Sequence, residues 1–502
     1  MAAVPQIASR DWSWRCLHCH GSLAPDASSL HCSVCGRRYP VLSGIPIFLR
    51  DPIGYVRSEL TSLTRAIQDA RRRRDSLERT GNDAGLSDMS LERHRDVIDA
   101  EIARAEAFLG LLEPAARALG DQPGETLGAR RSGWTVDALR PYLLRDWTST
   151  PELEAISARV GAALTQTIPD PSKTSVVFAA CGAGGLLAEI PPGFEQVLGF
   201  DLTLPVLRVV RHLLDGNSLD LAMARAINPP GYITLRRRER RSRGSPIELV
   251  AMDALDTAFA DGSVGCVVTS FLIDLFHEPQ RLAREIHRIL CDDGVWINYG
   301  PSGPLQAFIR FAETETAAFL DAAGFTVTGA AAYRSTYLDL SRDCPSWAFE
   351  SHVCYLTSAR KTGEVKEKLI PRAPDAAELP LAVPQHFRGA NLVHRQKLED
   401  EQTRTTILRH DGVPGRAISF EISSDIARVM MLVDGKRTVD EIANLFNRDA
   451  LSVPKDEIIR AFSQYFQQGL LNWRGGIDET DGSSGKLAVK DDAAAIRSGR
   501  DR

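Results

Sequence analysis

The sequence predicts an α/β fold built on a parallel sheet, with smaller units on either side of it. From Thr174 onward, short continuous apolar runs alternate with stretches of helical periodicity such as "RLAREIHRIL". Continuous apolar runs are typical of strands buried on both faces, and intervening helices return the chain to the same edge of a parallel sheet. The strand candidates are "SVVFAA" (175–180), "QVLGFD" (196–201), "IELVAMD" (247–253), "VGCVVTS" (264–270) and "GVWINYG" (294–300).

The length of 502 residues allows roughly two to four domains. Residues from about 55 to 120 have helical spacing, "EVKEKLIPRAPDAAELPLAVPQ" is a Pro-rich charged stretch, and the end is polar and rich in Gly and Ser. We therefore predict a zinc ribbon at 1–52, a helical segment at 53–135, the α/β domain at 136–361, a linker at 362–402, a winged-helix domain at 403–475 and a disordered tail at 476–502.

Composition excludes some classes of partner. The formal net charge of -5 argues against a nucleic-acid or membrane-surface protein. No apolar run approaches the roughly 20 residues that span a bilayer, and the start lacks the order of a secretion signal. Four of the nine cysteines cluster near the start and the others are scattered, which is typical of a reduced chain. We expect a cytoplasmic protein and leave its oligomeric state open.

The clustered cysteines form two C-x2-C pairs, and they predict a structural zinc site. Two such pairs supply four thiolates, which suits a closed tetrahedral zinc site; two redox dithiols or coincidence are the alternatives. The segment also resembles the zinc-ribbon family that activates tRNA and protein methyltransferases, through "C-x2-C-x-G-x-L", "L-x-C-x-x-C-G-R-x-Y-P-V" and "G-I-P". The predicted ligands are Cys16, Cys19, Cys32 and Cys35.

Two basic runs need an interpretation. Arg71 to Arg74 lie in the helical segment, where a solvated helix face is favoured over phosphate contact. Arg236 to Arg243 lie before the strand at 247–253, as either a solvated loop or an electropositive rim that recruits an acidic substrate such as a peptide.

A glycine loop follows the first strand. In "CGAGGLLA", Gly182 and Gly184 allow a sharp turn and close approach to a ligand. Asp201 ends the next strand, where it would accept hydrogen bonds from ribose hydroxyls, and Asp253 ends the third, near an adenine amino group. This Rossmann-like layout is that of an S-adenosylmethionine (SAM) site. A dinucleotide dehydrogenase is the alternative, but its G-x-G-x-x-G spacing is not met.

The central segment further resembles the carnosine N-methyltransferase family. "PYLLRDWTS", the glycine loop, "GFDLTLPVL", "VVTSFLIDLFHEPQRLAREIHRIL", "DDGVWINYGP" and "RSTYLDLS…WAFESHVCYLTSARK" occur in the family's order between Asp137 and Lys361. Members of that family use SAM to methylate an imidazole nitrogen of a histidine-containing dipeptide. The resemblance implies a class I methyltransferase fold, a SAM cofactor and a nitrogen acceptor.

Residue by residue, the resemblance implies two sets of contacts. The cofactor set comprises Arg145 at the SAM carboxylate, Gly182 in the methionine-side loop, Asp201 at the ribose, Asp253 and Ala254 at adenine, and Ser270 in the lining; Gly184 joins it from the glycine turn itself. The substrate set comprises Asp274, which matches the carboxylate that holds the imidazole, Tyr337, and Trp347 and Phe349, which stand where the family has tyrosines. The family's histidine after "W-I-N-x-G-P" has no counterpart, because Leu305 or Ala307 occupies that place. The family's glutamine three residues before the arginine is replaced by Tyr142.

Asp274 and His277 in "TSFLIDLFHEP" lie just past a central strand, at the edge where open α/β sheets bind ligands. A carboxylate there can accept the hydrogen bond of an acceptor N–H and stabilise the cation that forms on methylation. We expect Asp274 to contact the acceptor, with a helix N-cap or ion-pair role as the alternative. We expect His277 to be structural, because one carboxylate and one histidine make an incomplete metal site.

The C-terminal segment "MLVDGKRTVDEIANLF…IIRAFSQYFQQGLL" resembles the PqqD-like leader-peptide recognition family. Such domains are small winged helices that bind an extended peptide as an added strand. The sequence thus predicts a SAM-dependent N-methyltransferase acting on a ribosomally made peptide held by its leader. The alternatives are a small-molecule or histidine-dipeptide N-methyltransferase whose last domain serves assembly, and a non-catalytic zinc-ribbon and winged-helix adaptor.

Overall fold

The computed structural model describes most of the chain from Trp12 to Arg474. The described residues are 12–26, 29–81, 85–117, 136–148, 150–225, 228–236, 247–276, 279–301, 313–338, 350–365, 379–381, 383–386, 390–397, 402–409, 418–422, 429–448, 455, 458–459, 461–462 and 471–474. The predicted disorder of residues 476–502 lies outside this set.

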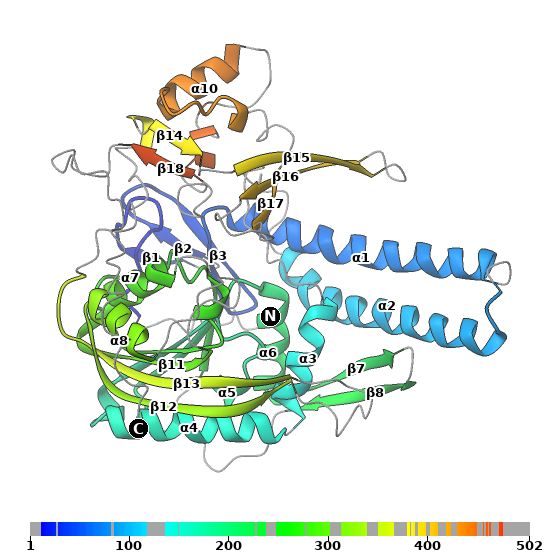
Figure 1. The fold of residues 1–502 in the computed structure, drawn as a ribbon, viewed down its shortest axis with the longest axis horizontal. Helices are drawn as coiled ribbons and strands as arrows, with labels where there is room; N and C mark the ends of the chain where they lie inside the picture. Colours follow the sequence, from blue (N-terminus) through cyan, green and yellow to red (C-terminus); the bar gives the residue numbers. More distant parts are fainter. Residues whose placement is uncertain are drawn as a thin grey trace, which may run out of the picture.

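An eleven-stranded sheet forms the centre of the protein, in the order β1-β2-β3-β4-β9-β6-β5-β10-β11-β13-β12 (Figure 1). Strands β9, β6, β5, β10 and β11 pair in parallel, and β13 adds antiparallel to β11. All five strand predictions are confirmed, and the fold is Rossmann-like. The bounds are β5 Ser175–Ala179, β6 Gln196–Asp201, β9 Ile247–Met252, β10 Val264–Ser270, β11 Leu290–Gly300, β12 Phe325–Tyr337 and β13 Glu350–Lys361.

Helices cover both faces of this sheet, which is why its strands read as unbroken apolar runs. On β5, Val176 and Phe178 face one cluster of buried side chains, and Val177 and Ala179 face the other. The first cluster includes residues of α3 Val136–Trp147, α4 Pro151–Thr167, α5 Gly185–Ala188 and α6 Leu204–Leu214; the second includes residues of α7 Pro279–Ile289 and α8 Glu313–Ala322. The 3-10 turns η1 Pro171–Lys173 and η2 Ile273–Leu275 precede β5 and follow β10.

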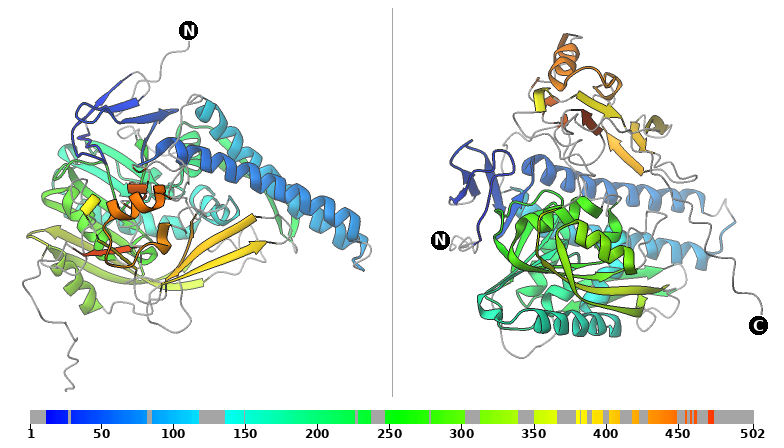
Figure 2. Two further views of the ribbon diagram at one scale, coloured as in Figure 1. Left: turned by 90° about the horizontal axis from the view of Figure 1, so that it is seen from above. Right: turned by 60° about the vertical axis from the view of Figure 1, so that its left-hand side comes forward.

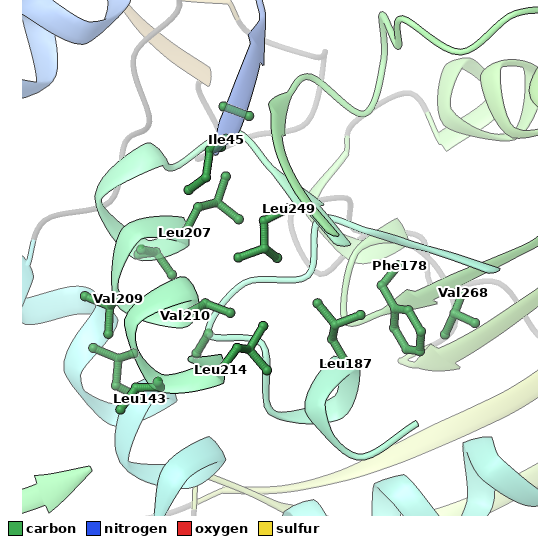
Figure 3. Packing of buried hydrophobic residues seen from close by; sticks show 14 of the residues in the cluster. Ile45, Leu143, Phe178, Leu187, Leu207, Val209, Val210, Leu214, Leu249 and Val268 are labelled. Carbon is green, nitrogen blue, oxygen red and sulfur yellow. The ribbon is translucent and has the colours of Figure 1, made fainter. Parts of the chain in front are cut away.

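Figure 3 shows how the first cluster positions the glycine loop. Leu187 of α5, directly after that loop, lies beside Phe178 of β5, and Leu207 of α6 lies beside Leu249 of β9. All four side chains are almost fully buried. Burying a leucine or phenylalanine contributes about 1.5–3 kcal/mol, so this packing holds the loop firmly against the sheet.

The N-terminal unit extends the central sheet. Its strands are β1 Leu23–Pro25, β2 Ser29–Cys32, β3 Arg38–Leu42 and β4 Ile45–Phe48. Strand β4 pairs in parallel with β9, with Phe48 opposite Met252. Trp14 stacks on Phe259 with 4.9 Å between ring centroids, so the unit is joined to the α/β domain by backbone pairing and aromatic packing.

Two long helices form an arm that extends beyond the sheet (Figures 1 and 2). Helix α1 is Pro52–Thr80 and α2 is Asp88–Arg117. Asp51 starts α1, because its Oδ1 accepts the Gly54 N–H at 2.8 Å and proline occupies the first turn. The hairpin of β7 Ser218–Arg225 and β8 Asn228–Arg236 lies along α2, where Arg104 Nη1 donates to the Ala222 carbonyl at 2.8 Å.

The run Arg71 to Arg74 forms a solvated helix face, as expected. Each arginine pairs with a carboxylate on α1 or α2, among them Arg71 with Glu106 at 2.7 Å and Arg74 with Asp99 at 3.3 Å. The second basic run, apart from Arg236, lies outside the described residues.

The C-terminal residues form a separate small core. The elements of the C-terminal residues are η3 Leu379–Leu381, β14 Val383–His386, β15 Ala390–Lys397, β16 Gln402–Arg409, β17 Ile418–Ile422, α10 Val439–Arg448 and β18 Leu471–Arg474, and those of the core are η3, α10 and β18. Strand β14 pairs with β18, and Leu379 packs with Val439 and Phe462. The structure therefore has strands and core residues within 362–402, where the sequence predicts a linker. Local composition hides them, because β14 contains a proline and pairs with a strand distant in the chain.

Candidate SAM and acceptor site

The parallel strands bring most of the predicted site residues to one edge. In the ladders, Ala179 lies opposite Phe200 and Thr269, and Asp201 lies opposite Ala251. The glycine loop, Asp201, Asp253 and Ser270 therefore follow neighbouring strands at their carboxyl ends. Open α/β sheets bind ligands at this edge.

The glycine loop is held by backbone geometry that requires glycine. Gly184 has φ +80°, and a Cβ there would lie 2.6 Å from a methyl of Val210. Gly182 has φ +54°, but a Cβ there would meet no atom within 4 Å. The loop is thus packed on one side and open at Gly182, where a ligand can approach the backbone closely.

Asp201 joins this loop to the second strand. Its Oδ2 accepts the Gly182 N–H at 3.0 Å and its Oδ1 accepts the Thr203 N–H at 2.8 Å. Burial raises the pKa of Asp201, and these N–H donors counter part of that rise. A carboxylate oxygen has two lone pairs, so each oxygen retains capacity for a ribose hydroxyl.

Asp253 and Ala254 begin the turn after β9. Asp253 Oδ1 accepts the Leu255 N–H at 3.0 Å, and Ala254 is buried. The same turn contacts the N-terminal unit, because Asp256 Oδ2 accepts from Arg50 Nε at 2.9 Å. The turn that the sequence places at adenine is therefore braced by residues from the first fifty.

The end of α3 clamps the glycine loop, a contact that sequence reasoning missed. Asp146 Oδ2 accepts the Gly185 N–H at 2.9 Å, and Trp147 Nε1 donates to the Ala183 carbonyl at 2.7 Å. Asp146 Oδ1 accepts from Arg145 Nε at 2.7 Å, so one carboxylate joins Arg145 to the loop. The sequence signal for this contact is the triplet "RDW", of which only the arginine, Arg145, is predicted to act in the site.

Arg145 keeps its charge in this buried setting. Burial alone would lower its pKa, but the carboxylates of Asp146 and Glu152 raise it. Glu152 Oε1 lies 3.6 Å from Arg145 Nη1, and the guanidinium stands over the Tyr142 ring at 5.6 Å. Arg145 is therefore a fixed cation beside the glycine loop, suited to an anionic group of a ligand.

Asp274 lies in η2, immediately after β10. Its side chain is 2% exposed, and Oδ1 has no hydrogen-bond partner among the described residues. Burial raises the pKa of Asp274 to about 6. A buried carboxylate oxygen without a partner is costly, so such groups mark sites where a ligand supplies the missing donor.

Aromatic side chains surround the approach to Asp274. Tyr337 and Tyr142 share a hydrogen bond between their hydroxyls at 2.9 Å, and the rings of Tyr337 and Phe271 lie 5.1 Å apart. Burial raises the pKa of Tyr337, and the Asp274 carboxylate adds to that rise. Phe271 itself has φ +50°, an uncommon backbone state for a bulky residue that is often found at functional sites.

Some predicted residues lie outside the described chain. These are His277, Trp347, Phe349 and the pair Leu305 and Ala307. Their proposed places in the site remain predictions.

The four clustered cysteines come together as expected. Their sulfur atoms all lie within 4.8 Å of one another, with 3.6 Å between Cys16 and Cys35 and 3.3 Å between Cys19 and Cys32. Burial would raise the pKa of Cys32, but the backbone N–H groups of Cys35 and Val34 lower it to about 7. No other group of His, Cys, Asp and Glu in the described ranges has metal-site geometry.

Comparison with known proteins supports the same class. Residues 178–297 match a family model described as "Methyltransferase domain". No curated protein matches the chain. Within the described residues, no helix is both long and apolar enough to cross a membrane.

One similar solved structure is that of the N-methyltransferase NodS from Bradyrhizobium japonicum in complex with S-adenosyl-L-homocysteine. Its sequence is 13% identical to this chain and the TM-score is 0.31, over 45% of this chain and 97% of that one. A protein from Pyrococcus horikoshii is 17% identical with a TM-score of 0.31, covering 46% and 100%. At these values no activity is carried over from either protein.

The class follows from the fold, the loop and the family match together. The parallel strand order, a glycine loop open at Gly182 and carboxylates at the ends of the next two strands fit SAM. The chain is a SAM-dependent methyltransferase.

Proposed function

We propose that the enzyme methylates a nitrogen atom, and that Asp274 holds the acceptor through an N–H group. The observation that carries this proposal is the buried Asp274 Oδ1, which has no donor among the described residues. An acceptor N–H would supply that donor. The carboxylate would also favour the positive charge that develops on the acceptor nitrogen.

The cofactor contacts are proposed residue by residue. Arg145 binds the methionine carboxylate, Gly182 and Gly184 shape the methionine-side loop, and Asp201 accepts from the ribose. Asp253 and Ala254 border adenine, and Ser270 lines the cofactor side of the acceptor. When bound, SAM supplies a methyl group already activated by its positively charged sulfur, so these residues mainly orient and enclose the reactants.

The aromatic groups give the acceptor pocket its shape. Tyr337, with Trp347 and Phe349, is proposed to line it. The ring of Tyr337 is fixed by its hydroxyl bond to Tyr142 and by Phe271. Electron-rich ring faces attract cations, which suits an acceptor that becomes positively charged.

The C-terminal residues are proposed to recruit the acceptor as part of a ribosomally made peptide. In the described residues β14 and β18 pair only with each other, so each leaves a strand edge that an extended leader peptide can extend. The "DGKRT" turn that resembles PqqD-like domains is well formed. Asp434 Oδ1 accepts the Lys436 and Arg437 N–H groups at 2.9 Å, and Thr438 and Glu441 form a capping box.

We further propose that the four N-terminal cysteines bind zinc for structure. Four thiolates at this separation match the closed sites that zinc forms, and such a small unit has little core of its own. The adaptor alternative is not supported, because the central domain is that of an enzyme.

The test is methyl transfer by the full-length protein. Purified enzyme with SAM is incubated with short precursor peptides encoded beside its gene, a histidine-containing dipeptide and an unrelated histidine-containing peptide, and products are identified by mass spectrometry. We expect a single nitrogen of the precursor to be methylated, and Asp274→Asn to lose most of this turnover. Methylation at oxygen, sulfur or carbon overturns the nitrogen assignment.

Peptide recruitment is tested by truncating the chain before Leu379, the first described residue of the C-terminal core. We expect turnover of the precursor to fall while turnover of the dipeptide is retained. Equal retention of both supports the small-molecule alternative.

A further inference from the structure

The hairpin of β12 and β13 rises past the end of the neighbouring strand. Gly300, the last residue of β11, lies opposite Tyr355. Residues 350–354 of β13 and their partners on β12, Tyr333 to Tyr337, therefore continue beyond the sheet edge where the site lies. This extension lies beside the end of β10, because Tyr337 on it is 5.1 Å from Phe271, the residue after that strand.

One face of this extension carries several groups capable of chemistry. Side chains alternate along a strand, and directly opposite residues share a face, so Ser335, His352 and Cys354 point to the same side as Tyr337. The contacts agree, because the His352 ring meets the Tyr337 ring edge-on at 5.1 Å and 87°. Val353 points to the other side and is 45% exposed.

Tyr337 connects this face of the hairpin to η2, because its ring lies 5.1 Å from the ring of Phe271, three residues before Asp274. Burial raises the pKa of Cys354 to about 11, and the Asp274 carboxylate adds to that rise as it does for Tyr337. Tyr337 and Cys354 lie on either side of His352 on this face. The His352 ring, which contacts Tyr337, therefore lies on the face of the hairpin that borders the turn of Asp274.

We propose that His352 is a catalytic residue of the acceptor pocket, where it removes the proton from the nitrogen that is to be methylated. This inference rests on the proposed nitrogen acceptor. His352 lies within the segment "WAFESHVCYLTSARK", but none of the roles assigned to that segment falls on it. It lies on β13, far in sequence from the glycine loop and from Asp274.

Such a group serves an acceptor that enters the pocket as a cation. An amine or imidazole that enters in its cationic form has no lone pair on the protonated nitrogen. When His352 takes this proton, the N–H bond breaks and its electron pair stays on nitrogen as the attacking lone pair. The proton is then released from His352 to water, so no oxidant, reductant or second reactant is needed.

Charged and titratable groups act on the two residues beside His352 on this face. Tyr142 and Arg145 on α3 and Asp274 in η2 act on Tyr337, and Asp274, with Glu152 and Arg159 on α4, acts on Cys354. Asp274 favours a cationic acceptor in the pocket, whereas Arg145 and Arg159 favour its neutral form. The pocket therefore contains groups suited to both stages of the proton transfer.

The experiment uses the full-length enzyme and imidazole as the probe. Binding of imidazole to the complex with S-adenosylhomocysteine is measured by calorimetry, and methyl transfer from SAM to imidazole by mass spectrometry, at about pH 6 and about pH 8. The variants are His352→Gln, Asp274→Asn and the matched control Val353→Ala, which changes the neighbour on the opposite face.

We expect His352→Gln to lower turnover by up to about tenfold at the lower pH, where only a small part of the imidazole is neutral, with a much smaller loss at the higher pH, where most imidazole is neutral before it binds. Val353→Ala should behave as the wild type. A loss that is equal at both pH values, or no loss, overturns the role of His352. So does wild-type binding of imidazole without turnover at either pH.

The outcome separates this inference from the proposed function. If Asp274→Asn abolishes imidazole binding and His352→Gln changes nothing, the nitrogen acceptor stands and the base is wrong. If the wild-type complex binds no imidazole, the proposed acceptor class and this inference both fall.

Discussion

Replacing Asp146 by asparagine tests the clamp between Arg145 and the glycine loop. Asp146 accepts two hydrogen bonds from buried groups, Arg145 Nε at 2.7 Å and Gly185 N–H at 2.9 Å. Asparagine offers one carbonyl oxygen, and its NH2 group must then face a donor of either Arg145 or Gly185. The variant keeps the size of the side chain but cannot make both contacts.

The magnitude follows from the nature of the lost contact. A hydrogen bond to a charged group contributes about 1.5–3 kcal/mol, and Asp146 is a buried partner of a charged arginine. We expect about this loss in the free energy of unfolding. If the loosened Arg145 no longer meets the carboxylate of the ligand, affinity for S-adenosylhomocysteine should fall at least tenfold, or about 1.4 kcal/mol.

The assay is calorimetry with two ligands. Methylthioadenosine shares the adenosine part of S-adenosylhomocysteine but lacks the amino-acid carboxylate, so Asp146→Asn should leave its affinity nearly unchanged. Trp147→Phe is the matched control, because it removes the bond to the Ala183 carbonyl without touching Arg145. Equal losses for both ligands would show that Asp146 only supports the loop, and unchanged affinities for both would refute the clamp.

Three further predictions concern stability. In the folded state the pKa of Asp274 is raised from 3.8 to about 6, so its ionisation lowers the free energy of unfolding as the pH rises through this range. Asp274→Asn should therefore raise the free energy of unfolding by up to roughly 3 kcal/mol at pH 8, with a smaller gain at pH 5. Equal gains at both pH values in denaturant titrations would contradict this. Gly185→Ala places a Cβ 2.5 Å from Asp146 Cβ and should lower the free energy of unfolding by about 1–3 kcal/mol. Gly110→Ala, whose added Cβ meets no atom within 4 Å, should stabilise α2 slightly. Similar melting temperatures for the two variants would be inconsistent with this packing. Removing metal with a chelator should lower the melting temperature of the whole α/β domain by at least about 5 °C, because the cysteine unit contributes β4 to its sheet. Zinc but not magnesium should restore the melting temperature. An unchanged melting curve would argue against a structural metal.

The sequence by itself determined the parts of this protein that depend on short-range pattern. Each of the five central strands is a continuous apolar run, and the glycine loop and Asp201 directly follow two of them. Because parallel strands end at a common edge, the positions of Asp201, Asp253 and Asp274 on that edge followed from the order of elements alone. The cysteine spacing likewise predicted that four sulfurs would meet.

Only the tertiary structure decided the contacts between segments distant in the chain. It showed that Asp146 accepts the Gly185 N–H and that the N-terminal unit adds a strand beside β9. It also placed His352 on the same face of the β12–β13 hairpin as Tyr337, with the two rings in contact. Such contacts depend on strand register and on how helices lie against the sheet, and these are set by packing of the whole core.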